Sequence, residues 1–191
     1  MTGKIIIDGA GDSFVTGEGN PNPENIILVD SGSSAIYSGV TIQNHNGSDS
    51  AVAVKAGATL TIYGGEILDS ITTGNGGGLS VMETSTVVIY DIFIKNCSAT
   101  LGGGLYVDSD ANVTIYDAEI VECSAQNGGG LYCKGDKIII SNINIVSNKA
   151  IQDNAIVDSG LGGGAYFGQV PKIYQAEIKY NSAELGGGIY L

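Results

Sequence analysis

Carboxylates, thiols and one imidazole are the side chains of this 191-residue chain that could do chemistry. The segment Asp108–Asn112 reads DSDAN and places oxygen-bearing side chains at alternate positions, as a calcium-binding loop does. It lacks the glycine at the sixth position and the distal glutamate of an EF-hand. We therefore expect a solvated turn here and no metal site.

The histidine and two of the cysteines fall in one column of a repeated pattern. His45, Cys97 and Cys123 each follow a strand-like segment, and the column continues with Asn148 and Asn181. Adjacent copies bring Cys97 and Cys123 within the separation that a disulfide tolerates, although reduced buried thiols are the commoner use of such positions. We expect His45 to be a turn residue and the asparagines to hydrogen-bond at the turn.

Two glutamates share another column. Glu119 and Glu177 have Asn144 between them, so their carboxylates would lie about 10 Å apart, at the edge of the geometry of an inverting glycoside hydrolase. We interpret them as part of an ordinary charged face. Cys133 alternates with apolar residues and is expected in the core, and three cysteines at these spacings do not make a zinc site.

A repeat of about 26 residues positions all of these side chains. Glycine triplets recur at steps of 26, 26, 34 and 24 residues, beginning at Gly76, Gly102, Gly128, Gly162 and Gly186. After each triplet, apolar residues alternate with a polar residue or a tyrosine, which predicts a strand with one buried face. Two further strands are predicted in each repeat, as over 113–115 and 118–120.

Equivalent residues of neighbouring coils should lie about 4.8 Å apart, so that each repeated position forms a column. One outward column reads Ser80, Tyr106, Tyr132, Tyr166 and Tyr190. We expect four exposed rings, which either bind a sugar or a partner protein or stabilise the sheet by stacking. The outward columns mix residue types, which argues against the flat threonine array of an ice-binding solenoid.

The chain is predicted to form one domain over residues 1–191, with irregular coils over 1–49 and regular coils over 50–191. KIIIDG and NIILVDSG are the expected opening strands. Extra residues around 151–160 lengthen one repeat, and insertions in a solenoid are frequent functional sites. Gln152, Asp153 and Asn154 are therefore candidate binding residues, with a neutral surface loop as the alternative.

The motifs KIIIDGAG, VTIQN and the recurrent GGGLY … I-x-x-N/C-x-A resemble the repeats of the pectin-lyase-like superfamily. The similarity is greatest to the Gly-Gly-rich repeats of polymorphic outer-membrane proteins and autotransporter-type adhesins, and it covers nearly the whole chain. It implies an all-β fold, a right-handed single-stranded parallel β-helix (solenoid). It implies a scaffold and says little about activity.

The charge of the chain restricts its partners. The net charge is −12, with eight lysines and no arginine, which disfavours nucleic acids and anionic membrane surfaces. No segment is long and apolar enough to predict membrane insertion. The resemblance implies that an enzyme of this fold would use a basic residue, commonly arginine, or clustered acids. The sequence has no arginine and no such acidic cluster, so we expect no catalytic residue, metal or cofactor.

We therefore expect a non-catalytic extracellular or cell-surface rod with a structural or adhesive role. A polysaccharide-binding or polysaccharide-degrading protein is the alternative. The expected partners are neighbouring coils or subunits stacked end to end, carbohydrate, or a cell-surface protein. The sequence stops at GGGIYL, one strand into a coil, which suggests either a piece of a longer solenoid or an end that stacks on another subunit. Sequons at Asn46, Asn96 and Asn112 are compatible with secretion.

Overall fold

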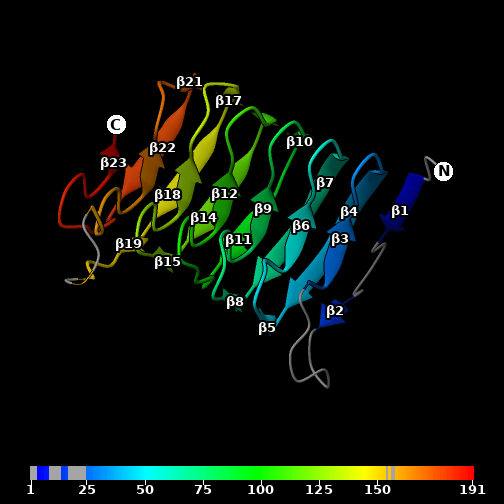
Figure 1. Ribbon diagram of the computed structural model, residues 1–191, viewed down its shortest axis with the longest axis horizontal. Coiled ribbons are helices and arrows are strands. Elements are labelled where there is room, and N and C mark those ends of the chain that lie inside the picture. The colour runs from blue at the N-terminus through cyan, green and yellow to red at the C-terminus, as the bar shows by residue number, and fades with distance from the viewer. Residues whose placement is uncertain (1–3, 9–13, 17–24, 154, 156–157) are drawn as a thin grey trace.

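The computed structural model describes residues 4–8, 14–16, 25–153, 155 and 158–191. Within these ranges every regular element is a β-strand, and the strands pair in parallel with their equivalents one coil away. The coils succeed one another along the long axis, from β1 at one end to β23 at the other (Figure 1). The predicted parallel β-solenoid with about 26 residues between coils is confirmed.

The first strand of each coil belongs to a seven-stranded parallel sheet, which we call the first sheet. Its strands in spatial order are β3 (Ile27–Val29), β6 (Val52–Val54), β9 (Leu79–Val81), β12 (Leu105–Val107), β16 (Leu131–Cys133), β20 (Ala165–Phe167) and β23 (Ile189–Tyr190). The strands β9, β12, β16, β20 and β23 are those predicted from the alternation after the glycine triplets, and β3 lies in the segment NIILVDSG that was predicted as an opening strand. They pair in register, so Leu79, Leu105 and Leu131 form one inward column.

The second and third strands of each coil belong to a twelve-stranded sheet. Its members are β1 (Lys4–Asp8), β2 (Phe14–Thr16), β4 (Ser34–Gln43), β7 (Thr59–Leu68), β10 (Thr86–Ile89), β11 (Phe93–Lys95), β13 (Asn112–Ile115), β14 (Ala118–Val121), β17 (Ile138–Ile140), β18 (Ile143–Val146), β21 (Lys172–Ile173) and β22 (Ala176–Lys179). In the later coils the second and third strands are separate, with a corner between them. In β4 and β7 the chain stays paired around the corner, where Gly39 and Gly64 have φ of 60° and 80°.

A further corner carries two-residue strands that sequence patterning did not predict. They are β5 (Asn46–Gly47) and β8 (Ile71–Thr72), which pair with each other, and β15 (Ser124–Ala125) and β19 (Lys149–Ala150), which also pair. Isolated bridges such as Ser98 to Ser124 continue this pairing between them. The backbone is therefore hydrogen-bonded from coil to coil at this corner as well as along the sheets.

The core consists of inward columns of isoleucine, leucine and valine. Ile62, Ile89 and Ile115 stack in register, and each is no more than 1% exposed. Burying one such side chain contributes roughly 1.5–3 kcal/mol, and β-branched residues suit the parallel strands that present them. No helix is needed to cover the core because the three sides of each coil close on it.

The glycine triplets are explained by close approach of the backbone. Gly102 has φ of 62°, a conformation that side chains disfavour. A Cβ at Gly103 would overlap the carbonyl oxygen of Gly129 and the backbone of Ser124. A Cβ at Gly104 would lie 2.7 Å from a methyl carbon of Ile120 in the core. The three positions thus exclude side chains for three different reasons, and each triplet marks the entry into the first sheet.

Candidate functional site

The tyrosine column of the first sheet is stacked as expected but is not fully exposed. Ring centroids lie 5.7 Å apart for Tyr106 and Tyr132, 4.6 Å for Tyr132 and Tyr166, and 5.4 Å for Tyr166 and Tyr190. Tyr106 is only 2% exposed, so the prediction of four exposed rings is wrong at this position. The other three rings are half-buried.

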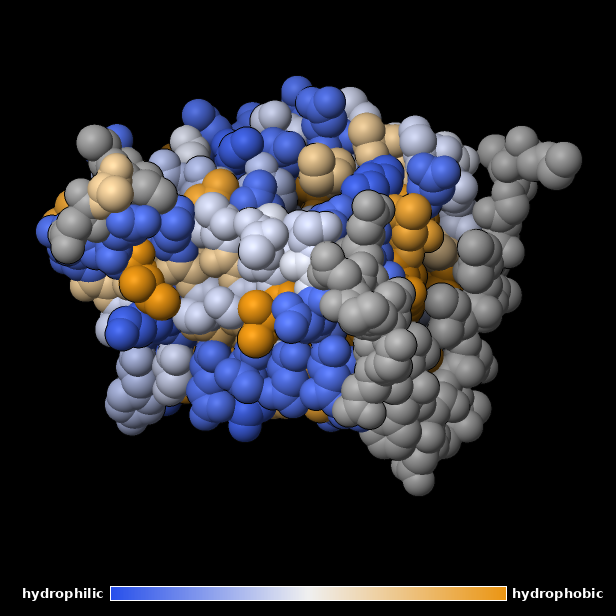
Figure 2. Space-filling model, turned by 60° about the horizontal axis from the view of Figure 1, so that its bottom comes forward, coloured by the Kyte–Doolittle hydropathy of each residue, from blue (hydrophilic) through white to orange (hydrophobic). Residues whose placement is uncertain are grey.

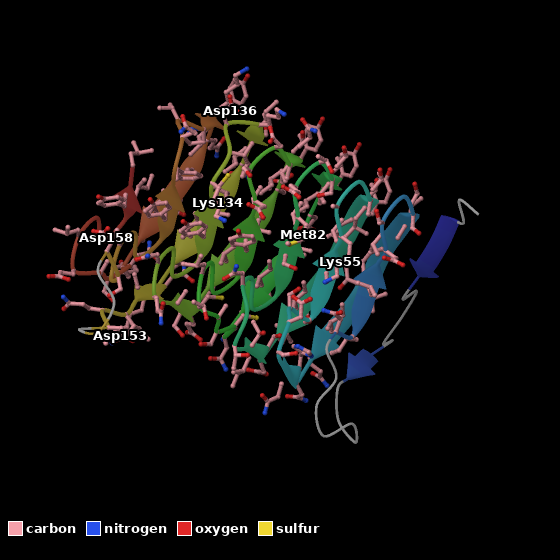
Figure 3. All side chains as sticks on the ribbon, in the orientation of Figure 1. Lys55, Met82, Lys134, Asp136, Asp153 and Asp158 are labelled. Atoms are coloured by element: carbon pink, nitrogen blue, oxygen red, sulfur yellow. The ribbon has the colours of Figure 1, made fainter. Side chains whose placement is uncertain are left out.

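Tyr106 is enclosed by its neighbours on the outer surface. The Nζ of Lys134 lies 5.6 Å from the Tyr106 ring centroid, and it pairs with Asp108 at 3.4 Å. Burial raises the pKa of the Tyr106 hydroxyl. Lys55 and Asp49 form a similar pair at 2.8 Å, and Ala53, which is in register with Ser80 of the outward column, is fully buried. Lys55, Met82 and Lys134 follow one another along the molecule (Figure 3). These two ion pairs therefore cover part of the outer surface of the first sheet.

The column that was predicted to be a turn faces the interior. His45, Ser70, Cys97, Cys123 and Asn148 are each no more than 1% exposed. The Nε2 of His45 lies 2.7 Å from the carbonyl oxygen of Asp49, so Nε2 carries the proton and donates. Its Nδ1 is buried without a partner among the described residues. His45 is therefore a residue of the corner, as predicted for a turn residue, and its side chain is buried.

The two asparagines of this column satisfy the backbone, as predicted. Asn148 accepts a hydrogen bond from the N–H of Cys123 at 2.9 Å and donates to the carbonyl of Ile120 at 2.9 Å. Asn181 repeats the pattern one coil later, since it accepts from the N–H of Asn148 at 2.8 Å and donates to Ile145 at 2.8 Å. Each amide side chain thus bonds backbone groups of other coils.

The cysteines are free thiols in the structure. Cys97 and Cys123 donate to the carbonyls of Lys95 at 3.4 Å and Val121 at 3.3 Å. The contact with Cys123 and burial raise the pKa of the Cys97 thiol well above its ordinary value. Burial raises the pKa of Cys133 to about 11, in keeping with its predicted core position. Buried, protonated thiols are poor nucleophiles and poor metal ligands.

The inserted loop at 151–160 is tied to the coils on either side. The hydroxyl of Ser159 accepts from the N–H of Asp153 at 2.8 Å, and Asn127 donates to the carbonyl of Asp158 at 2.8 Å. Gln152 is exposed and Asp153 half-buried, while the predicted Asn154 lies outside the described residues. Asp153 and Asp158 both lie on the side of the molecule near its C-terminal end, away from Asp136 (Figure 3). A shallow hollow of about 450 Å³ adjoins Gln152 and Glu184.

The acidic residues do not converge. Glu119 and Glu177 point outward with Asn144 between them in the register of β14, β18 and β22. In the DSDAN segment, Asp108 and Asp110 pair with Lys134 and Lys137, as expected for a solvated turn. Among the described residues no three His, Cys, Asp or Glu side chains are grouped closely enough to hold a metal ion.

A second aromatic ladder was missed in the sequence. Tyr63, Tyr90 and Tyr116 stack with centroids 4.7 Å and 5.0 Å apart and planes within 8°, and they are 50%, 41% and 44% exposed. Tyr90 and Tyr116 directly follow β10 and β13, whereas Tyr63 lies within the continuous strand β7. The signal was present as the recurrent Ile-Tyr at 62–63, 89–90 and 115–116.

The ladder borders a face of the twelve-stranded sheet that carries no charge. On β7, β10 and β13 the outward columns are Thr59, Thr86 and Asn112, and then Thr61, Val88 and Thr114. Together with Tyr63, Tyr90 and Tyr116 these residues form a three-by-three block, which we call the hydroxyl face. This face is richer in threonine than the mixed outward columns expected from the sequence, because the first residue of each of these strands also points outward.

Elsewhere the apolar surface is dispersed. Figure 2 shows hydrophobic residues as separate patches among hydrophilic and intermediate ones on the face that it presents. A cavity of about 280 Å³ lies at the N-terminal end of the first sheet, lined by β3 and the start of β4. A wider groove of about 490 Å³ lies beside Asn112 and Thr114 and extends to Lys137, Ile139 and Lys172. This groove adjoins the hydroxyl face.

No family model, no curated protein and no solved structure matches this chain. The described residues contain no helix with the length and hydropathy needed to cross a membrane.

Proposed function

We propose that this protein is a non-catalytic rod with a structural or adhesive role at a cell surface or outside the cell. The continuity of its columns supports this role, because the same inward positions stay apolar from coil to coil while polar side chains are spread along the outside. Successive coils are hydrogen-bonded to one another, which makes a solenoid stiff along its axis. The GGGLY repeats support a relationship with the pectin-lyase-like superfamily and with Gly-Gly-rich surface adhesins.

We propose that the solenoid stacks end to end through the strands β21, β22 and β23. Ile189 of β23 is in register with the inward column of Leu131 and Ala165 in the preceding coils. A further coil placed on β23 would cover this residue and extend the parallel ladder. We propose a second copy of the chain as the occupant of this surface, which gives a head-to-tail contact that repeats.

Light scattering and electron microscopy over a range of protein concentrations, with and without calcium, test this proposal. We expect the particles to lengthen with concentration into thin filaments whose axial repeat is near the length of one rod. Ile189→Lys should abolish the lengthening, while Ile139→Lys, on an outward position that is 38% exposed, should leave it unchanged. A particle size that does not depend on concentration would contradict end-to-end assembly.

Catalysis is the competing function for a β-solenoid with exposed carboxylates. Incubating the protein with a panel of polysaccharides should release no new reducing ends and no unsaturated products. Release of either product would replace the structural role with a polysaccharide hydrolase or lyase.

A further inference from the structure

We propose that the hydroxyl face and the groove beside it bind a neutral polysaccharide chain that lies along the solenoid axis. This inference names the partner of the adhesive role proposed above and rests on that role. It concerns lateral residues of β7, β10 and β13 and is independent of the stacking surface at β23.

The first argument is the distribution of charge. The chain carries a net charge of −12, yet none of the nine residues of the hydroxyl face is ionisable near neutral pH. An acidic glycan would be repelled by the surrounding carboxylates, whereas a neutral polymer pays no such electrostatic cost. Among extended polymers, the charge pattern therefore favours a neutral one.

The second argument is the hydrogen-bonding capacity of the face. Seven of its nine side chains end in a hydroxyl group, four from threonine and three from tyrosine. Each hydroxyl can both donate and accept, as the hydroxyls of a sugar do, so a sugar ring is satisfied in more than one orientation. The methyl groups of Thr61, Val88 and Thr114 supply apolar contact for the C–H groups of a sugar ring.

The third argument is the shape of the hydroxyl face. The stacked rings of Tyr63, Tyr90 and Tyr116 cover one another, so they present edges and hydroxyl groups to the solvent and form a wall. The threonine columns form a floor beside this wall. A linear polymer lies along such a step and meets equivalent groups about every 4.8 Å. A flat crystal plane, such as that of ice, would be held off by the wall.

The groove extends the same surface toward the C-terminal coils. Asn112 and Thr114 belong both to the hydroxyl face and to the groove, which is also lined by one carboxylate and two amines, those of Asp136, Lys137 and Lys172. Lys137 is held by Asp110 at 3.1 Å, which leaves its remaining N–H groups available as donors. A chain lying on the hydroxyl face therefore continues into a hollow of about 490 Å³ that also offers hydrogen-bond donors.

Affinity electrophoresis tests this inference, because the acidic protein migrates freely in a native gel. The gels contain hydroxyethylcellulose, a β-1,3-glucan, mannan, xylan or galactan, with polygalacturonate as the acidic comparison. We expect retardation by at least one neutral polymer. Tyr90→Ala, in the centre of the wall, should weaken binding about tenfold or more. Tyr132→Ala, which removes a stacked ring from the first sheet, is the matched control and should bind like the wild type.

Three results would overturn the inference. They are the absence of retardation by any neutral polymer, equal loss in Tyr90→Ala and Tyr132→Ala when both melt like the wild type, and stronger retardation by polygalacturonate. Inhibition of ice growth that is lost in Tyr90→Ala would instead assign the face to a crystal plane. The gels are run at concentrations where light scattering shows single molecules, so failure of polysaccharide binding and failure of end-to-end assembly are separate results.

Discussion

At the scale of single residues, left-handed backbone conformations recur at the corners of the coil. At the corner after the first sheet, Gly32, Gly57, Thr84 and Asp110 occupy equivalent positions with φ between 58° and 74°. Glycine adopts this conformation without cost, whereas a β-branched residue does so at about 1–2 kcal/mol. Thr84 is therefore the strained member of this column.

Replacing Thr84 with glycine should stabilise the protein. We expect the free energy of unfolding to rise by about 1 kcal/mol, because relief of strain exceeds the extra chain entropy of glycine in the unfolded state. Urea denaturation measures this as a higher midpoint at an unchanged slope. Thr86→Gly makes the same exchange two residues later on strand β10 and should instead lower the midpoint. Destabilisation by Thr84→Gly would show that the Thr84 side chain has a role that outweighs its backbone strain.

Residue roles could be predicted from the sequence where the repeat itself contains the partner. Asn148 and Asn181 recur in one column, so their hydrogen bonding at the corner was foreseeable and is confirmed. The burial of Tyr106 was not, because it depends on Lys134, which lies on the next coil. The burial of His45 was missed for a similar reason, since no repeat pattern indicated that Asp49 would accept its hydrogen bond.

At the scale of the strand and its corner, the glycine triplet is the element most sensitive to substitution. Gly103→Ala would force a methyl group into the backbones of Gly129 and Ser124, which cannot move without breaking the ladder. We expect a loss of at least about 2 kcal/mol in the free energy of unfolding, measured by urea denaturation.

Gly135→Ala is the matched control for the glycine triplet. Its new Cβ would come no closer than 3.4 Å to the backbone of the neighbouring coil, an ordinary contact, so stability should change by less than about 0.5 kcal/mol. Similar losses in both variants would mean that steric overlap with the neighbouring backbone does not explain the triplets.

The strands themselves were largely predictable because apolar and polar residues alternate in them. The first strands at Leu79, Leu105 and Leu131 are confirmed. The continuous ten-residue strands β4 and β7 were not predicted, since they turn a corner through Gly39 and Gly64 without losing their partners. The hydroxyl face was missed because a polar residue at the start of a strand does not show by itself to which surface it points.

At the scale of the whole molecule, the coils are interchangeable units. Deleting residues 102–127 removes one coil and joins Leu101 to Gly128. Leu101 and Asn127 are equivalent bridge partners in neighbouring coils, so the new junction has the same geometry as the present one between Asn127 and Gly128. Leu79 would then pair with Leu131 in place of Leu105. We expect a shorter solenoid with the same far-ultraviolet circular dichroism per residue and a somewhat lower melting temperature.

The control deletion is residues 102–114, which removes half a coil. This deletion turns outward-facing residues toward the core in every later coil. The far-ultraviolet circular dichroism signal of β-sheet should therefore be lost for those coils. If both deletions fold equally well, the columns do not determine the register of the solenoid.

The in-register pairing of each strand with its equivalent one coil away also bears on how the protein folds. Thr86 pairs with Thr59 on one side and Asn112 on the other, and this separation along the chain does not grow as coils are added. Relative contact order therefore decreases with length, and the loop-closure entropy of each added coil stays constant. Once one pair of coils has formed, the rest can fold by elongation on a preformed template, at a rate per coil that does not depend on the length of the rod.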